Sequence, residues 1–136
     1  MEKKNLRSKL LEFQLVESRL KVLESRRNLI LSKIAEIERT IQCLNDVQKS
    51  GESEILLSIG SNVYVPGSLK KSEKFLVELG AGVIVEKNFE GARSFLEKRL
   101  KILENGIASI ENEIVNLSQR LNELEREIRK KVEKVE

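Results

Sequence analysis

Few side chains in this sequence could carry out chemistry, and their spacing favours none of the common catalytic arrangements. The chain has no histidine, so the usual proton shuttle at neutral pH and the commonest metal ligand are both missing. Its single cysteine, Cys43, has neither a histidine to activate it nor a second thiol with which to hold zinc. Carboxylate pairs such as Glu111 with Glu113 lie in a charged periodic segment, where solvent exposure is the usual state. We therefore expect neither an enzyme nor a metal site.

One glycine-rich stretch, Gly80-Ala81-Gly82, resembles the opening of a phosphate-binding loop. A nucleotide fingerprint needs a helix N-terminus directly after its glycines, whereas a β-branched run, Val83-Ile84-Val85, follows here. We interpret the stretch as a turn and expect no cofactor. Any mechanism is then passive, without a nucleotide-driven step.

These glycines belong to a block that repeats itself after twenty residues, since ILLSIGSNVYVPGSL aligns with FLVELGAGVIVEKNF. Leu56 falls on Leu76 and Gly60 on Gly80. Each copy is a short apolar run, a break that contains glycine, and a β-branched run, which is the pattern of a β-hairpin. The block predicts two tandem hairpins within residues 54–87, forming a small four-stranded sheet.

The alternation within this block predicts which sheet face is used for assembly. Apolar residues at odd-numbered positions share one face, as a half-buried strand requires. The opposite face is also partly apolar, and a sheet this small has too little of its own chain to cover it. We therefore expect an oligomerisation surface at four even-numbered residues: Leu56, Tyr64, Leu76 and Ile84.

Long helices are predicted on both sides of the hairpins, over residues 1–50 and 88–136. Apolar residues recur at alternating spacings of three and four in both segments, which is the heptad pattern of a coiled coil. In the first segment this seam is interrupted by Arg27 and is broadly apolar near its start; in the second it runs from Leu96 to Ile128 without a polar member. Gly51 is expected to end the first helix and Asn88 to cap the second. Because the segments have matched lengths, we predict that they fold back on each other as an antiparallel coiled coil.

Composition agrees with long helices rather than a globular core. Charged residues make up 35% of the 136 residues with their signs interleaved, and there are four Phe, one Tyr and no Trp. A net charge of +3 does not imply a nucleic-acid partner, and no stretch has the apolar length of a membrane span. We expect an α+β chain of one domain in the cytoplasm, with two helices for reach and a sheet for assembly.

At this point the chain resembles the alpha-class subunits of prefoldin, the archaeal and eukaryotic co-chaperone. The similarity covers essentially the whole chain and is most specific over LVELGAGVIVEKNFEGARSFLEKRL, residues 76–100. It implies a hexamer of two alpha-class and four beta-class subunits, whose hairpins join into β-barrels from which the coiled coils project. It also implies capture of unfolded polypeptides at the distal coiled-coil tips and their delivery to a group II chaperonin.

On this sequence those tips are the two ends of the chain. The residues expected to contact clients are Leu6, Leu10, Leu11, Phe13, Val16, Ile128, Val132 and Val135. Each of them can equally be explained as ordinary packing at the fraying end of a coiled coil.

Two other functions fit the same pattern. One is a structural coiled-coil scaffold that binds no client. The other is a nucleic-acid-binding helical arm that uses a basic cluster in the last segment: Arg126, Arg129, Lys130, Lys131 and Lys134. Suppression of the aggregation of a denatured protein would distinguish the co-chaperone from both alternatives. Salt-dependent binding of nucleic acid would support the nucleic-acid-binding arm.

Overall fold

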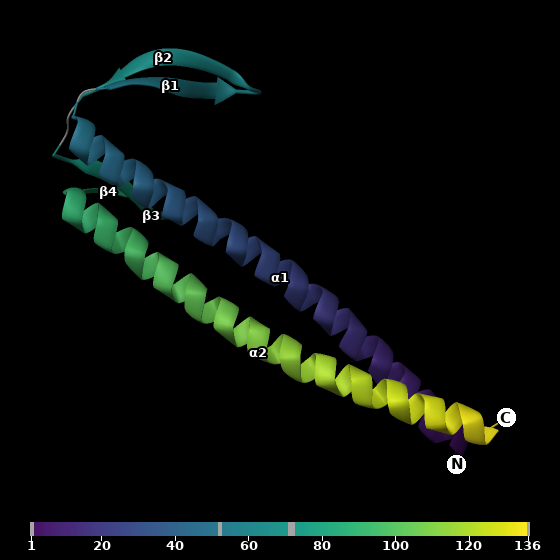
Figure 1. Ribbon diagram of the computed structural model, residues 1–136. Coiled ribbons are helices and arrows are strands. Elements are labelled where there is room, and N and C mark those ends of the chain that lie inside the picture. Colours follow the sequence, from purple (N-terminus) through teal and green to yellow (C-terminus); the bar gives the residue numbers. More distant parts are fainter. Residues whose placement is uncertain (1, 52, 71–72, 136) are drawn as a thin grey trace. The chain divides into compact units, whose positions relative to one another are not determined.

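The computed structural model of the chain describes residues 2–51, 53–70 and 73–135. The elements follow one another as helix α1, strands β1 to β4 and helix α2 (Figure 1). The chain divides into two compact units, one made of Met1–Lys33 with Leu103–Glu136 and the other of Ile34–Ile102. Each unit is described below by itself.

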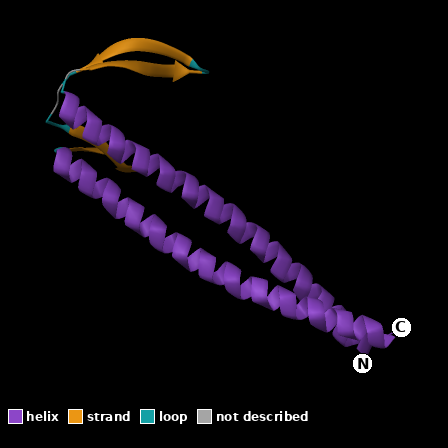
Figure 2. Cartoon of the chain, in the orientation of Figure 1, coloured by secondary structure: helices purple, strands orange, loops and turns teal. Residues whose placement is uncertain are grey.

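Two long helices account for the first unit and extend into the second. Helix α1 spans Glu2–Ser50 and helix α2 spans Phe89–Val135 (Figure 2). Within the first unit they run antiparallel, since Lys9 on α1 pairs with Glu127 on α2, and Arg19 pairs with Glu113. The antiparallel helix pair predicted from the heptads is confirmed.

The interior of the first unit is a thin aliphatic seam. Leu23 and Leu124 are the largest fully buried side chains, at 1% and 0% exposure, and Leu20 is 9% exposed. Two helices alone can bury only a narrow strip, so most other seam residues stay half-buried. The stability of the first unit therefore depends on a small number of buried residues.

Arg27 interrupts this seam on α1, as the sequence predicted. Its side chain is half-buried, and its Nε atom is buried without a hydrogen-bond partner in the part of the chain that the structure describes. On α2, a glycine stands in the same region: a Cβ built on Gly106 would meet only the Cδ1 atom of Ile30, at 4.0 Å. The seam of the first unit thus contains a charged residue on α1 and a glycine on α2 in the same region.

The second unit carries the hairpins. Strand β1 (Ser53–Gly60) pairs antiparallel with β2 (Val63–Leu69), and β3 (Phe75–Gly80) pairs with β4 (Val83–Lys87). Both turns have two central residues with positive φ, which is 43° and 66° at Ser61 and Asn62 and 50° and 78° at Ala81 and Gly82. This geometry matches the right-handed twist of the paired strands, as in a type I′ turn. The two predicted hairpins are confirmed, with both glycine-containing breaks as their turns.

The expectation of one four-stranded sheet is wrong for the single chain. Among the described residues, the hairpins form two separate two-stranded sheets. Each hairpin therefore has two edges whose backbone groups are not paired by the other hairpin, and such edges favour pairing with another chain. Twenty-residue repetition predicts the hairpins but contains no information about which strands pair between them.

The second hairpin is held to α2 by a specific contact. Arg99 donates a hydrogen bond from Nη2 to the backbone oxygen of Leu79 over 3.2 Å, and its guanidinium lies 4.5 Å from the centre of the Phe95 ring. Phe75 and Val77 in β3 are half-buried. This hairpin thus packs partly within its own subunit.

The helix ends facing the hairpins are capped as the sequence predicted. Gly51 has a φ of 68° and donates its N–H to the oxygen of Val47 over 3.3 Å, which ends α1 at Ser50. The Oδ1 atom of Asn88 accepts the N–H of Gly91 over 2.7 Å, so Asn88 is the N-cap of α2.

Candidate functional site

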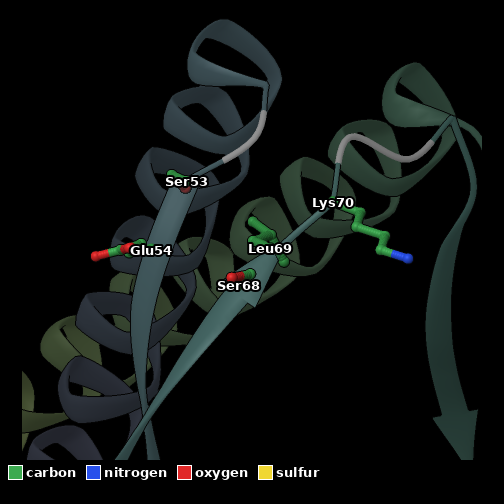
Figure 3. A pocket seen from close by; sticks show the side chains of 5 residues that line it. All are labelled: Ser53, Glu54, Ser68, Leu69 and Lys70. Carbon is green, nitrogen blue, oxygen red and sulfur yellow. The ribbon is translucent and has the colours of Figure 1, made fainter.

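The described residues offer no obvious reaction centre. They contain no group of three or more His, Cys, Asp or Glu side chains that could hold a metal ion. A hollow at the open end of the first hairpin is lined by Ser53, Glu54, Ser68, Leu69 and Lys70. Figure 3 shows the Glu54 and Lys70 side chains pointing away from each other, so they do not converge on a bound molecule. The candidate sites are therefore surfaces, and there are two of them.

The first surface is the end of the helix pair that carries both termini. A network of ion pairs joins the helices here. The guanidinium of Arg120 donates two hydrogen bonds to Glu12, from Nε to Oε1 over 2.8 Å and from Nη2 to Oε2 over 3.0 Å. It also donates to Glu123 over 3.2 Å, while Lys9 pairs with Glu127. This two-pronged contact fixes the relative position of the helices more tightly than a single charge pair would.

The network shifts the acidity of its members. Hydrogen bonds from Arg120 lower the pKa of Glu12 below its ordinary value, and the hydrogen bond from Lys9 lowers the pKa of Glu127. Hydrogen bonds to Glu12 and Glu123 raise the pKa of Arg120. All of these groups keep contact with solvent, Glu123 being exposed and the other four half-buried, so the network orients the helices and contributes only modestly to stability.

The structure divides the eight predicted client-contact residues into two groups. Half-buried residues in the helix pair are Leu6, Phe13, Val16 and Ile128. Exposed residues are Leu10 at 44%, Leu11 at 58% and Val132 at 41%. Val135 is the last residue of α2, and its side chain is outside the part of the chain that the structure describes. The exposed group offers most of its surface to another molecule, whereas the half-buried group shares its surface with the helix pair.

Additional exposed aliphatic residues lie further along α1, and the sequence reasoning missed most of them as a surface. Leu15, Val22 and Leu29 are 64%, 44% and 69% exposed. They recur every seven residues, one position before the seam residues Val16, Leu23 and Ile30. This seven-residue spacing could have revealed the surface from the sequence. It was overlooked because the seam residues have the same period and are more numerous.

The second surface is formed by the hairpins. The four residues predicted for oligomerisation are all exposed: Leu56 at 68%, Tyr64 at 55%, Leu76 at 72% and Ile84 at 59%. Leu56 stands opposite Pro66, and Tyr64 opposite Ser58, on the same face of the first hairpin. Leu76 and Ile84 similarly share a face of the second hairpin, opposite Glu86 and Glu78.

The opposite, odd-numbered face was expected to be half-buried; in the first hairpin this holds for Ile55 but is wrong for the residues nearer the turn. Leu57, Ile59, Val63 and Val65 are 51%, 66%, 52% and 42% exposed. Alternating apolar residues predict that one face of a strand becomes buried, but they do not show whether the same chain or another chain buries it. Near the turn, both faces of β1 and β2 are therefore available to another molecule.

Two long antiparallel helices joined by a pair of hairpins with exposed aliphatic surfaces are the architecture of an assembly subunit. The chain belongs to the prefoldin subunit family, whose model matches residues 16–134. Its members are non-enzymatic chaperone subunits, and within the family this chain is similar to the alpha class. The resemblance stated from residues 76–100 is confirmed.

Individual relatives agree. The prefoldin subunit alpha of Nitrosopumilus maritimus is 32% identical over 112 residues, covering 82% of this chain and 77% of the relative. That of Pyrococcus horikoshii is 29% identical over 117 residues, covering 85% and 79%. Human prefoldin subunit 5 is 37% identical over 70 residues, covering 51% of this chain and 46% of the relative.

A solved structure shows the same fold. A chain of the filamentous PFD from Methanocaldococcus jannaschii superposes with a TM-score of 0.72 at 22% sequence identity, covering 84% of this chain and 95% of that one. No helix in the described part of the chain is long and apolar enough to cross a membrane.

Proposed function

We propose that this chain is one prefoldin alpha-type domain, residues 1–136, that works in the cytoplasm as an ATP-independent co-chaperone subunit. It assembles through its hairpins with beta-class subunits, in a hexamer of two alpha and four beta chains. It captures unfolded polypeptides at the helix ends that carry the termini and hands them to a group II chaperonin. Family membership supports the chaperone role, and the exposed leucines on α1 support the capture site.

The observation that carries the capture proposal is the placement of Leu10 and Leu11. Both lie on α1 in the first unit, beside a shallow hollow that is also lined by Lys4, Arg7 and Gln14. Exposed aliphatic side chains grouped with flexible polar ones suit a binding surface for unfolded chains of varied sequence. Each such site is small, so useful affinity requires several subunits holding one client together.

Photo-crosslinking tests the capture site directly and is not affected by similar sites on partner subunits. A photoreactive residue placed at Leu11 in the assembled complex should crosslink to a denatured client. The matched control is Val115 on α2, which is 54% exposed and lies in the same unit. Crosslinks of equal yield at both positions, or at neither, would contradict the proposed site and favour a scaffold without client binding.

Assembly is tested separately on the hairpins. Leu56→Glu combined with Ile84→Glu places charges on the exposed sheet faces and should reduce the mass of the complex measured by light scattering, because a buried unpaired charge is costly. Ser61→Glu, in the exposed turn, should leave the mass unchanged. An intact complex with both hairpin charges in place would show that these faces are not the interface.

A further inference from the structure

Helix α1 carries a second stripe of uncharged residues on the side away from the seam. The stripe, called the outer stripe below, alternates spacings of three and four: Ser8, Leu11, Leu15, Ser18, Val22, Ser25, Leu29 and Ser32. All eight residues are exposed. At ~1.5 Å per residue it extends for about 36 Å along the helix. It therefore has the period of a helix-packing seam, but no segment in the described part of the chain covers it.

The equivalent positions on α2 differ. After Ile102 they are occupied by polar or charged residues: Asn105, Ser109, Asn112, Asn116, Gln119, Glu123, Arg126 and Lys130. Solvent exposure of a helix alone therefore does not account for the outer stripe on α1. The outer stripe would instead suit a partner molecule that packs against α1 and not against α2.

The charges that border the outer stripe are positive. Arg7 and Lys21 lie in the row of side chains on one side of the stripe, and Arg19 and Arg26 lie in the row on its other side. Each is three or four positions from members of the stripe and is therefore their neighbour on the helix surface. The one acidic neighbour in these rows, Glu12, is already bound by the two hydrogen bonds from Arg120. Arg19 pairs with Glu113, whereas Arg7, Lys21 and Arg26 make no ion pair with any residue that the structure describes.

An aliphatic stripe bordered by positive charges is complementary to a partner whose apolar residues are bordered by negative charges. We propose that the outer stripe of α1 is the track along which a client polypeptide lies, and that it prefers apolar segments bordered by aspartate or glutamate. The inference deepens the proposed chaperone function and rests on it. It extends the client surface from the tip residues Leu10 and Leu11 towards Leu29.

Charge complementarity argues against two other occupants. A second α1 would bring a stripe bordered by the same positive charges, so the two copies would repel each other. Nucleic acid would satisfy the cations, but the stripe has only aliphatic and serine side chains and no aromatic ring on which a base could stack. A polypeptide satisfies both the aliphatic residues and the cations.

Two labelled peptides test the preference on the full-length chain assembled with its beta-class partner. Both carry Leu and Val at alternating three and four spacings, and one is bordered by Glu while the other is bordered by Lys. Fluorescence anisotropy should give about tenfold tighter binding of the Glu peptide at low salt, from a few exposed charge pairs. The difference should shrink at ~1 M salt, where the screening length falls to about 3 Å.

Matched variants locate the binding. Leu15→Ser with Leu29→Ser should weaken binding of both peptides, whereas Ile102→Ser with Val115→Ser, at similarly exposed positions of α2, should not. Lys21→Glu with Arg26→Glu should abolish the preference for the Glu peptide. Lys98→Glu with Lys101→Glu makes the same change in net charge on exposed residues of α2 and should preserve it.

The outcomes separate this inference from the proposed function. Equal affinity for the two peptides, or equal effects of the α1 and α2 variants, would overturn the outer stripe as an acid-preferring track. If a denatured client is still protected in that case, the chaperone proposal stands; if protection is also absent, the chaperone proposal fails with it. Single-stranded DNA that binds more tightly than the Glu peptide and displaces it would overturn the inference in favour of nucleic acid.

Discussion

Helices α1 and α2 have nearly the same length, 49 and 47 residues, but they distribute their apolar residues differently. In α2 most aliphatic side chains concentrate in one seam, and the positions equivalent to the outer stripe are polar or charged after Ile102; Val115 and Val132 are exposed aliphatic residues elsewhere on this helix. In α1 they occupy the seam and also the outer stripe, and the seam is interrupted by Arg27. A helix that only needs to pack against one partner requires one stripe. The difference indicates that α2 serves mainly to support α1, while α1 also presents a surface.

The largest effect should come from the buried seam of α2. Leu124→Ala removes a fully buried side chain and should lower the free energy of unfolding by about 2 to 4 kcal/mol, measured by chemical denaturation of the assembled complex. Leu29→Ala, on the outer stripe, should cost less than about 0.5 kcal/mol because the residue is 69% exposed. Equal losses would mean that the outer stripe packs against another part of the complex, and the contrast between the helices would fail.

A smaller effect of opposite sign is expected at the interruption in α1. Arg27→Leu should raise the free energy of unfolding by about 1 kcal/mol, because it removes a buried polar atom without a partner and continues the seam. Arg26→Leu, on the exposed neighbouring face, is the control and should change stability by less than about 0.5 kcal/mol. Destabilisation by Arg27→Leu would show that the guanidinium makes a favourable contact in the complex.

The glycine in α2 should have a slightly smaller effect. Gly106→Ala should stabilise the helix by about 0.5 to 1 kcal/mol, since its new Cβ would have only an ordinary contact with Ile30. Gly91→Ala is the matched control, because its Cβ would lie 3.0 Å from Oδ1 of Asn88 and crowd the N-cap. Thermal unfolding monitored by circular dichroism should move upwards for the first variant and not for the second.

The smallest effect concerns the ion pairs that join the two helices near the termini. The pKa values of Glu12 and Glu127 are lowered from the ordinary value of 4.5, so their contribution is present above about pH 4.5 and is lost as the pH falls through their lower folded values. Hydrogen-exchange protection at the ends of α1 and α2, measured relative to the intrinsic exchange rate of free amides at each pH, should therefore fall at acid pH. In a Glu12→Gln, Glu127→Gln variant the ends should exchange faster at neutral pH, and the difference from the unmodified chain should vanish at low pH. A constant difference at all pH values would exclude these carboxylates as the cause.

Much of the fold could be predicted because its signals are local. Heptad spacing, the residues at Gly51 and Asn88, and the two glycine turns each depend on a few neighbouring positions. The repeat of the hairpin block was visible for the same reason. The separation of the hairpins into two sheets was not predictable, because strand pairing between them depends on contacts that no short stretch of sequence encodes.

The candidate sites were predicted less completely. Leu56, Tyr64, Leu76 and Ile84 were chosen as exposed apolar residues, and they are exposed. The tip residues were grouped together by composition, although Phe13 is half-buried and Leu11 is open to solvent. Assigning each apolar residue to the seam or to the outer side requires the heptad phase, and the broadly apolar start of α1 obscured that phase.

The sequence by itself determined the class of this protein: helix, two hairpins and helix, with aliphatic seams and without the side chains of a histidine-based catalyst. Periodicity and turn chemistry act within a few residues, so they can be recognised without coordinates. Only the tertiary structure decided which aliphatic residues are buried between the helices, such as Leu23 and Leu124, and which remain exposed, such as Leu15 and Leu29. Burial depends on what another segment covers, and a helix with two apolar stripes can pack only one of them against a single partner.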